Sequence, residues 1–406
     1  MSHGTPLIPR TENVVDQLVF DALDEAPATS ENLLIQGDAD DGLPELLQRY
    51  ESRVRLVLTD PPYNTTSRFF HYGDSRTPES WLRDRERHAR LLHALLRHDG
   101  SLWMHLDDSE MHYCKVMLDR IFGRANFVAS VVWQKNLSRD NRTDISTTHE
   151  YLLVYAKDRR TWARSRNSLP STPEQLNRYR NPDDDPRGPW TSGDLTAKAG
   201  PGRRQAQFFD VTTPSGRVVR PAHGMAWRLT RERFDELLAD GRITFGDGNQ
   251  VPRLKRFLRE TQGGLVPTTW WAGTEVGTTD VAKKQLRRLF PDLVPFETPK
   301  PEQLAHRVIT IASDPGDIVL DCYAGSGTTP AVAHKMRRHW IAIEREPRVI
   351  NEFLKPRLDQ VISGEDVGGV SGICAWHGGG AFEHRISTSS LQAQPELAAL
   401  AEGIPT

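Results

Sequence analysis

Short apolar runs alternate with amphipathic segments along most of the chain. The apolar runs are bounded by Gly, Pro or Asp, and several are followed by segments with helical periodicity. The strands predicted from this pattern cover residues 31–38, 56–59, 101–106, 127–134, 150–156, 317–321 and 340–344. The predicted helices cover residues 44–50, 109–122, 301–312 and 330–338. This alternation predicts an α/β fold with a doubly wound, mostly parallel sheet and helices on both faces.

A change of composition in the middle of the chain suggests how it is divided. Residues 157–264 are richer in Arg, Asp, Gly and Pro than the segments on either side, and residues 213–216 carry a hairpin signal. We therefore predict one α/β domain that is interrupted by an insert. The expected parts are an N-terminal arm (1–30), the first half of the domain (31–156), the insert (157–264), the second half (265–386) and a C-terminal tail (387–406).

Composition supports an ordinary globular protein. The chain has 406 residues, 37% of them hydrophobic, and ten tryptophans, which is enough for a substantial core. We find neither a signal peptide nor a run of eighteen apolar residues, so we expect a soluble, cytoplasmic protein that makes no membrane contact. The three cysteines lie far apart and do not have metal-ligand spacing, so no metal is expected.

The charge distribution gives only local signals. The net charge is −2, so any binding to nucleic acid must depend on local basic patches. Five arginines lie on one further predicted helix, after residue 80, and we expect them to form a solvated face. They are Arg83, Arg85, Arg87, Arg90 and Arg97.

The tetrapeptide Asp60-Pro61-Pro62-Tyr63 ends the apolar run at residues 56–59. Two prolines can neither donate to a strand ladder nor continue a helix, so a stiff loop follows the strand. The loop presents a carboxylate, rigid carbonyls and an aromatic ring. These groups suit a planar amine, because the oxygens can accept its hydrogens while the ring stacks on the base. An ordinary proline-rich turn is the alternative.

A glycine-rich turn follows the predicted strand at 317–321 and precedes a helix-like segment. Gly325 and Gly327 allow a ligand to approach the backbone, and the helix N-terminus favours a carboxylate. The next predicted strand ends in Glu344, about 20 residues after the glycines, where an acid binds ribose hydroxyls in doubly wound folds. The pattern indicates a nucleoside site. An NAD-dependent dehydrogenase would also use such a loop, but it would leave the Asp-Pro-Pro-Tyr sequence unexplained.

Together the two motifs resemble those of the beta-class amino-group DNA methyltransferases, which use S-adenosylmethionine. The order also agrees, with the catalytic motif before the cofactor motif and a long insert between them. Residues 270–277 and 357–366 resemble the modification subunits of type III restriction–modification systems. The chain is shorter than expected for a complete subunit of that type, so a solitary or phage-type relative stays open. The resemblance implies a bacterial, archaeal or phage-encoded protein.

The resemblance carries roles onto individual positions. It implies that Asp60, Pro61, Pro62 and Tyr63 are catalytic. It implies that the methyl donor, S-adenosylmethionine, is bound by Asp38, Lys300, Asp321, Cys322, Gly325, Gly327, Thr328 and Glu344. Within this set, Asp38 would contact the adenosine, Thr328 the methionine carboxylate and Glu344 the ribose. For Lys300, an ordinary surface position is an equally good interpretation.

The resemblance also implies double-stranded DNA as the substrate, a homodimer and a restriction subunit as a further partner. The insert would be the target-recognition region. Its candidate DNA contacts are Arg203, Arg204, Arg217, Arg220, Lys255 and Arg256.

The expected reaction is methylation of the N6 amine of a flipped-out adenine, because Asp rather than Ser begins the tetrapeptide. An N4-cytosine enzyme, RNA as the substrate and a catalytically silent DNA-binding relative remain alternatives. The intact Asp60, Tyr63 and Glu344 argue against the last of these.

Overall fold

The computed structural model describes residues 31–65, 76–199, 205–260, 264–294 and 296–387. Two compact units divide the chain, Ser168–Pro267 and the sequence on either side of it. The expected insert was 157–264, but helix α5 (Arg159–Ser165) belongs to the flanking unit, where its Ser165 carbonyl accepts from Arg55 at 2.9 Å. The expected N-terminal arm, and all of the expected tail except residue 387, lie outside the described residues.

The larger unit is built on a sheet that has nine strands within the described residues, in the order β13-β4-β5-β3-β2-β14-β15-β1-β16. Strand β5 is antiparallel to its neighbours β3 and β4, and the other pairs are parallel. This confirms the predicted mostly parallel sheet. The strands are β1 (Leu33–Gln36), β2 (Val54–Thr59), β3 (Leu96–Leu106), β4 (Phe127–Gln134), β5 (His149–Ala156), β13 (Trp270–Trp271), β14 (Ile318–Asp321), β15 (His339–Glu344) and β16 (Glu383–Ile386).

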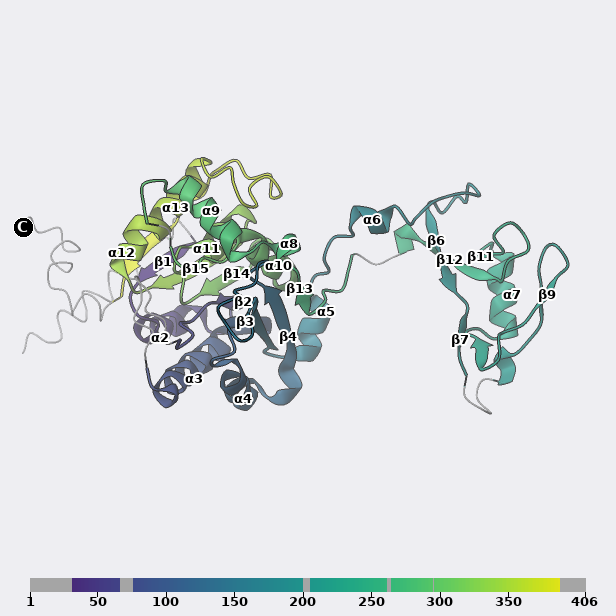
Figure 1. Cartoon of the computed structure of the whole chain (residues 1–406), viewed down its shortest axis with the longest axis horizontal. Coiled ribbons are helices and arrows are strands. Elements are labelled where there is room, and N and C mark those ends of the chain that lie inside the picture. Colours follow the sequence, from purple (N-terminus) through teal and green to yellow (C-terminus); the bar gives the residue numbers. More distant parts are fainter. Residues whose placement is uncertain (1–30, 66–75, 200–204, 261–263, 295, 388–406) are drawn as a thin grey trace, which may run out of the picture. The chain divides into compact units, whose positions relative to one another are not determined.

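Helices cover both faces of this sheet (Figure 1). Helices α2, α3 and α4 pack side by side on one face, and α10, α11 and α13 pack together on the other. The helices of this unit are α2 (Ala39–Tyr50), α3 (Pro78–Leu95), α4 (Met111–Phe122), α5, α8 (Gly273–Val276), α9 (Thr279–Leu289), α10 (Glu302–Ala312), α11 (Thr328–Lys335), α12 (Pro347–Val349) and α13 (Lys355–Ser363), with a π-helical turn at Ile350–Leu354 and a 3₁₀ turn at Arg124–Asn126. No helix in the described ranges has the length and hydropathy that crossing a bilayer requires.

Two helices begin earlier than the sequence predicts, for local reasons. Helix α2 starts at Ala39 rather than at residue 44, because the Asp38 side chain accepts from the backbone N–H of Asp40 and caps it. Helix α11 starts at Thr328, directly after Gly327, which has a φ of 78°. That left-handed conformation is accessible to glycine, so the turn can pass straight into the helix.

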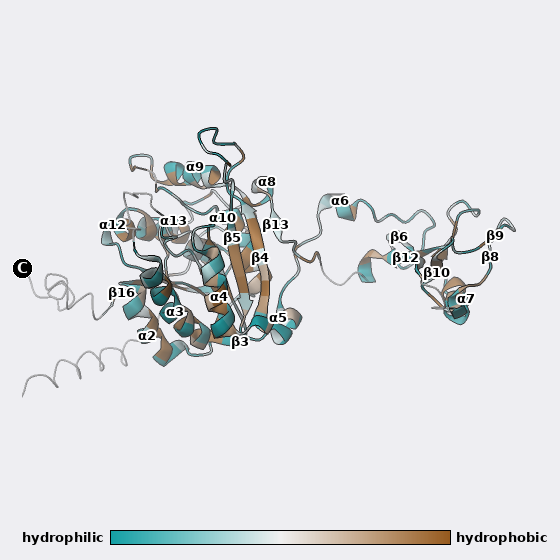
Figure 2. Ribbon diagram, turned by 60° about the horizontal axis from the view of Figure 1, so that its bottom comes forward, coloured by the Kyte–Doolittle hydropathy of each residue, from teal (hydrophilic) through white to brown (hydrophobic). Residues whose placement is uncertain are grey.

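The core lies between the sheet and its helices. The strands are hydrophobic over much of their length, as Figure 2 shows for β4 and β5. Val57, Leu102 and Leu153 on the sheet belong to the same buried cluster as Leu43 of α2 and Leu118 of α4. Each such side chain contributes roughly 1.5–3 kcal/mol on burial. The central strands are therefore a rigid base for the loops at their ends.

Strands β2 and β14 are neighbours, with Leu56 opposite Val319 and Val57 opposite Leu320. From β2 the chain passes through α3 to β3, and from β14 it passes through α11 to β15, on the other side of the pair. In open α/β sheets a crevice forms beyond the carboxyl ends of strands at such a switch point. Asp60 and the glycine-rich turn both follow these two strands.

The second unit, Ser168–Pro267, has its own small core, which includes Leu195, Trp227, Phe234 and Ile243. The predicted hairpin at residues 213–216 joins the antiparallel strands β8 and β9. The elements of this unit are α6 (Pro173–Leu176), β6 (Trp190–Asp194), β7 (Thr196–Lys198), β8 (Val211–Thr212), β9 (Val218–Val219), β10 (Met225–Trp227), α7 (Arg231–Ala239), β11 (Ile243–Thr244) and β12 (Arg253–Phe257), with 3₁₀ turns at Gln205–Gln207 and Leu258–Glu260.

Candidate active site

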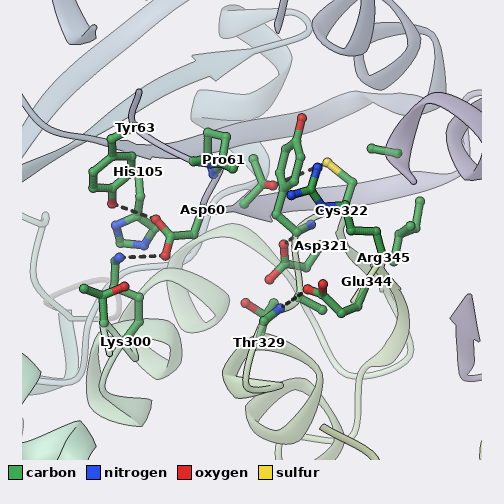
Figure 3. A pocket seen from close by; sticks show the side chains of 18 of the residues that line it. Asp60, Pro61, Tyr63, His105, Lys300, Asp321, Cys322, Thr329, Glu344 and Arg345 are labelled. Atoms are coloured by element: carbon green, nitrogen blue, oxygen red, sulfur yellow. Dashed lines mark hydrogen bonds and ion pairs between the residues drawn. The ribbon is translucent and has the colours of Figure 1, made fainter. Parts of the chain in front are cut away.

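A cavity of about 360 Å³ opens at the carboxyl ends of β2, β14, β15 and β1. It lies entirely within the larger unit. All the predicted catalytic residues line it, and so do all the predicted cofactor residues except Gly327. Figure 3 shows two groups of side chains in the cavity, one around Asp60 and the other around Asp321 and Glu344.

Asp60 accepts from two side chains that come from different parts of the chain (Figure 3). The Tyr63 hydroxyl donates to its Oδ1 at 2.6 Å, and the Lys300 ammonium donates to its Oδ2 at 2.6 Å. The same ammonium lies 5.2 Å from the centre of the Tyr63 ring. A carboxylate has about four lone-pair directions, so both oxygens can still accept from a ligand.

Glu150, at the start of β5, is a second carboxylate beside this group. It accepts from Lys135 at 3.0 Å and from the Tyr63 hydroxyl at 3.2 Å, and Lys300 lies 3.5 Å away. Burial alone would raise the pKa of Glu150, but Lys300 and Lys135 outweigh it and lower the pKa to about 2. Burial would likewise lower the pKa of Lys300, but the two carboxylates raise it. The cluster therefore holds permanent charges of both signs.

Two further groups of this cluster stay neutral. Burial, together with the charges of Asp60 and Glu150, raises the pKa of Tyr63 well above its ordinary value, so the hydroxyl remains a donor. Burial and the nearby Lys300 lower the pKa of His105 to about 4. The His105 Nδ1 is buried and has no hydrogen-bond partner among the described residues.

Glu344 and the glycine-rich turn form the other end of the cavity. The Glu344 carboxylate accepts from the backbone N–H of Gly325 at 2.8 Å and of Glu346 at 2.9 Å. Burial raises its pKa. Gly325 has a φ of 50°, a region that side chains disfavour, so the turn needs glycine there. The carboxylate and the turn thus form one hydrogen-bonded unit that lines the cavity.

Asp321 and Cys322 are buried beneath this turn. Burial raises the pKa of Asp321 to about 7, although Thr329 and the Tyr323 backbone N–H donate to its carboxylate. Burial raises the pKa of the Cys322 thiol to about 12, and its Sγ lies 3.4 Å from the Thr59 hydroxyl. A thiol of this kind packs and is not reactive.

Thr328 is already fully engaged. Its hydroxyl donates to the Lys300 carbonyl at 3.1 Å and accepts from Arg357 at 3.0 Å. Its one hydrogen is therefore not available to the methionine carboxylate that the sequence analysis paired with it. Arg357 also donates to the Ser326 carbonyl and to the buried Glu302, which binds Lys335. This buried network holds the glycine-rich turn from behind.

The chain also matches a known family over this region. The model of the family described as DNA methylase, which covers N6 and N4 methyltransferases, matches residues 54–355, including both motifs and most of the residues that line the cavity. The chain belongs to the DNA methylase family.

Curated relatives of this DNA methylase include subunits of restriction–modification enzymes. The chain is 30% identical to the type III restriction–modification enzyme StyLTI Mod subunit of Salmonella typhimurium, over 83% of the chain and 54% of the relative. It is 27% identical to the type III restriction–modification enzyme EcoP15I Mod subunit of Escherichia coli, over 83% of the chain and 60% of the relative. It thus spans a little over half the length of these relatives.

Solved structures with related folds are more distant in sequence. They include the PvuII DNA methyltransferase, which is cytosine-N4-specific, at 15% identity and a TM-score of 0.44, over 82% of this chain and 89% of that one. They also include a complex of M1.HpyAVI with S-adenosylmethionine, at 13% identity and a TM-score of 0.37, over 81% of this chain and 97% of that one.

Asp38 lies at the edge of the cavity, in a group that has metal-ligand geometry. Among the described residues, Asp38, Asp40 and His88 bring their ligand atoms within 4.8 Å of one another. Arg87 and His88 both donate to Asp40, however, so the chain already supplies a cation at this position. The donor set is therefore a poor metal site.

The candidate DNA contacts of the second unit differ in accessibility. Arg203 and Arg204 lie outside the described residues. Arg217 and Arg256 are exposed, and Arg220 is exposed but pairs with Asp210 at 2.7 Å. Lys255 is buried, and its ammonium binds both Asp183 and Asp185, the latter at 3.0 Å. Because its charge is already compensated inside the unit, we leave Lys255 out of the proposed DNA contacts.

Several polar residues that line the cavity were not predicted from the sequence. Glu150, Lys135 and His105 lie at the ends of predicted strands, where the placement of polar side chains could have indicated a site. The arginines expected on a solvated face also need correction, because Arg97 lies in β3 and Arg85 is buried.

Proposed function

We propose that the chain transfers a methyl group from S-adenosylmethionine to the N6 amine of a flipped-out adenine at one short sequence in duplex DNA. The observation that supports this most directly is the single cavity lined by Asp60, Tyr63, Glu344 and the glycine-rich turn. The cavity has a carboxylate for an amine at one end and a carboxylate for a ribose at the other. Its size is within the range of small-molecule sites.

The main task of the protein in this reaction would be to position the adenine amine and the methyl group. An exocyclic amine of adenine is a poor nucleophile, because its lone pair is delocalised into the ring. Asp60 and the carbonyl of Pro61 accept its two hydrogens and favour a tetrahedral nitrogen. S-adenosylmethionine would supply the methyl group: the nitrogen lone pair would form the N–C bond, the C–S electron pair would remain on sulfur, and Asp60 would take one proton from the nitrogen. Alignment of these atoms supplies most of the remaining rate.

The target base must leave the helix to reach this cavity, at a cost of a few kcal/mol. The Tyr63 ring would offset part of that cost by stacking, which contributes roughly 1–3 kcal/mol for a base on an aromatic ring. Lys300 lies over the same ring and fixes Asp60. We assign Lys300 to the catalytic end of the cavity, whereas the resemblance placed it with the cofactor.

The cofactor, when bound, supplies an electrophilic methyl group. Glu344 would accept from its ribose hydroxyls, and Asp38 would contact its adenosine. The turn at Gly325 and Gly327 would let it approach the backbone closely. Asp321 and Cys322 would support this turn from below, because both are buried.

Partners are proposed from the relatives. The Mod subunits belong to type III restriction–modification enzymes, so we propose double-stranded DNA as the substrate and a restriction subunit as a partner. We also propose a homodimer and a cytoplasmic location. The unit at Ser168–Pro267 is the proposed target-recognition region, with Arg217 and Arg256 among its DNA contacts.

The test is to incubate the protein with labelled S-adenosylmethionine and mixed genomic DNA, and then to map modified bases by single-molecule sequencing. We expect N6-methyladenine at one short sequence and no label with Asp60→Ala. N4-methylcytosine would replace the adenine assignment with the cytosine alternative. Binding of the cofactor without modification of any DNA would refute the proposed substrate.

A further inference from the structure

Arg85 carries a buried charge in the wall of the cavity. It belongs to α3 and lines the cavity, yet only 7% of the residue is exposed. Its Nε and Nη1 are buried and have no hydrogen-bond partner among the described residues. A buried donor without a partner is destabilising, and more so when the group is charged. The buried Arg85 guanidinium therefore lacks hydrogen-bond acceptors among the described residues.

Aromatic rings fix the position of this guanidinium. It lies 4.8 Å from the centre of the Tyr323 ring and 5.6 Å from the Trp81 ring. Trp81 is itself fixed, because its indole N–H donates to the Pro62 carbonyl at 2.7 Å. Rings attract a cation but offer no acceptor in the plane of its N–H groups. The guanidinium is thus held in place while two of its nitrogens, Nε and Nη1, have no acceptor among the described residues.

The position of Arg85 along the cavity restricts what can bind it. Trp81, one turn earlier on α3, reaches the catalytic loop at Pro62. His88, about one turn later, contacts Tyr323 and Asp40 near the proposed adenosine end. Arg85 therefore lies between the two ends, where the part of the cofactor around sulfur and its amino-acid chain would pass. The Thr328 hydroxyl, the earlier candidate for the carboxylate, has no free hydrogen.

We propose that Arg85 binds an oxyanion of the ligand, namely the methionine carboxylate of S-adenosylmethionine. The inference rests on the proposed function. A fixed guanidinium with unused donors matches a carboxylate in charge and in hydrogen-bonding capacity. A phosphate of the target DNA strand has the same chemistry and is the second possible source. The two sources predict different losses when Arg85 is replaced.

Isothermal titration calorimetry on Arg85→Met tests this proposal. The ligands are S-adenosylmethionine and 5′-methylthioadenosine, which retains the adenosine and the thioether but has no amino acid. We expect at least tenfold weaker binding of S-adenosylmethionine and less than twofold change for 5′-methylthioadenosine. Arg85→Lys keeps the charge without the fork and should give an intermediate loss. The matched control is Arg83→Met, an exposed arginine on the same helix.

The other outcomes are distinct. If a phosphate is the oxyanion, both nucleoside ligands bind Arg85→Met as they bind the wild type. Duplex DNA, titrated in S-adenosylhomocysteine, then binds at least tenfold more weakly, with a salt slope smaller by about one. Unchanged binding of all three ligands overturns this inference alone. A wild-type protein that binds neither nucleoside ligand overturns the proposed function as well. If Arg85→Met does not fold, the binding of the same ligands is compared between Arg85→Lys and the wild type.

Discussion

The Lys300 ammonium lies 2.6 Å from the Asp60 carboxylate, although 240 residues separate the two in the chain. The contact joins the loop after β2 to the segment before α10, and it places a cation on the carboxylate that we propose for catalysis. Lys300 also lies 3.5 Å from Glu150, so one ammonium faces two acids. A residue from the other half of the domain thus supplies a positive charge beside the loop that follows β2.

Replacing Lys300 should shift the pH dependence of methylation. In Lys300→Met, Glu150 loses the cation that does most to lower its pKa, so that pKa rises, and Asp60 loses its ammonium donor. Because the amine needs an ionised acceptor, the acidic limb of the kcat profile moves to higher pH. Lys300→Arg should keep the limb near its original position. An unchanged acidic limb in Lys300→Met would show that the contact does not control the charge.

Asp60→Ala should abolish most methyl transfer while the fold persists. Loss of a positioned proton acceptor lowers kcat by about 10²–10⁴-fold. Affinity for S-adenosylmethionine should change little, because its proposed ribose and carboxylate contacts lie elsewhere in the cavity. Single-turnover methylation and calorimetry measure the two quantities. The control is Asp108→Ala, an exposed carboxylate that does not line the cavity.

Two variants of Tyr63 should distinguish its stacking role from its hydrogen-bonding role. Tyr63→Phe removes the donor to Asp60 and Glu150 but keeps the ring, so activity should fall by less than about tenfold. Tyr63→Ala also removes the stacking surface, and a further loss of roughly 5–150-fold should follow. Fluorescence of 2-aminopurine at the target base reports flipping in both variants. Equal activity of the two variants would exclude a stacking role.

Ionisation of the buried Asp321 carboxyl group should lower the free energy of unfolding as the pH rises. Its folded pKa is raised to about 7 from an ordinary value of 3.8, so the folded state holds the proton more tightly than the unfolded state. Stability from this group is complete below about pH 4 and is lost as the pH rises through 7. The total is at most about 4 kcal/mol. Urea unfolding at pH 5 and pH 8 should show a smaller drop for Asp321→Asn than for the wild type.

Lys255 and Arg256 are neighbours that should behave oppositely. Lys255→Met leaves Asp183 and Asp185 without a shared cation, so unfolding should become easier by at most about 3 kcal/mol, since Arg187 still pairs with Asp185. Arg256→Ala should leave stability unchanged and reduce the salt slope of DNA binding by about one. Thermal unfolding and filter binding distinguish them. Equal DNA affinity of Arg256→Ala and wild type would remove Arg256 from the interface.

Local signals predicted much of the fold and the ends of the cavity. Asp60 and Glu344 each follow an apolar run, and carboxyl ends of parallel strands meet at one edge of a sheet, so their placement needed no knowledge of distant contacts. The helix starts at α2 and α11 were missed, because they depend on a cap at Asp38 and on the backbone of Gly327.

The positions of the remaining site residues could be predicted only from the strand order or from a closer reading of the helix and strand periodicity. Glu150 reaches Tyr63 and Lys300 only because β5 runs antiparallel and brings its first residues to the edge of the sheet where the cavity lies. Arg85 falls four residues after Trp81 and seven before Leu92, on the buried face of α3, so its helical spacing could have predicted burial. Lys255 shares a strand face with Phe257, which could have predicted the same.

The position of β1 in the sheet has a consequence for how the protein is made. This strand leaves the ribosome early, but both of its neighbours, β15 and β16, are translated near the end of the described chain. Until then, its edges have no partner, and the nascent chain depends on other means to avoid wrong pairing. The proposed methyl-donor site is also incomplete at that stage. A stalled or truncated product would therefore carry the Asp-Pro-Pro-Tyr sequence without the proposed methyl-donor site.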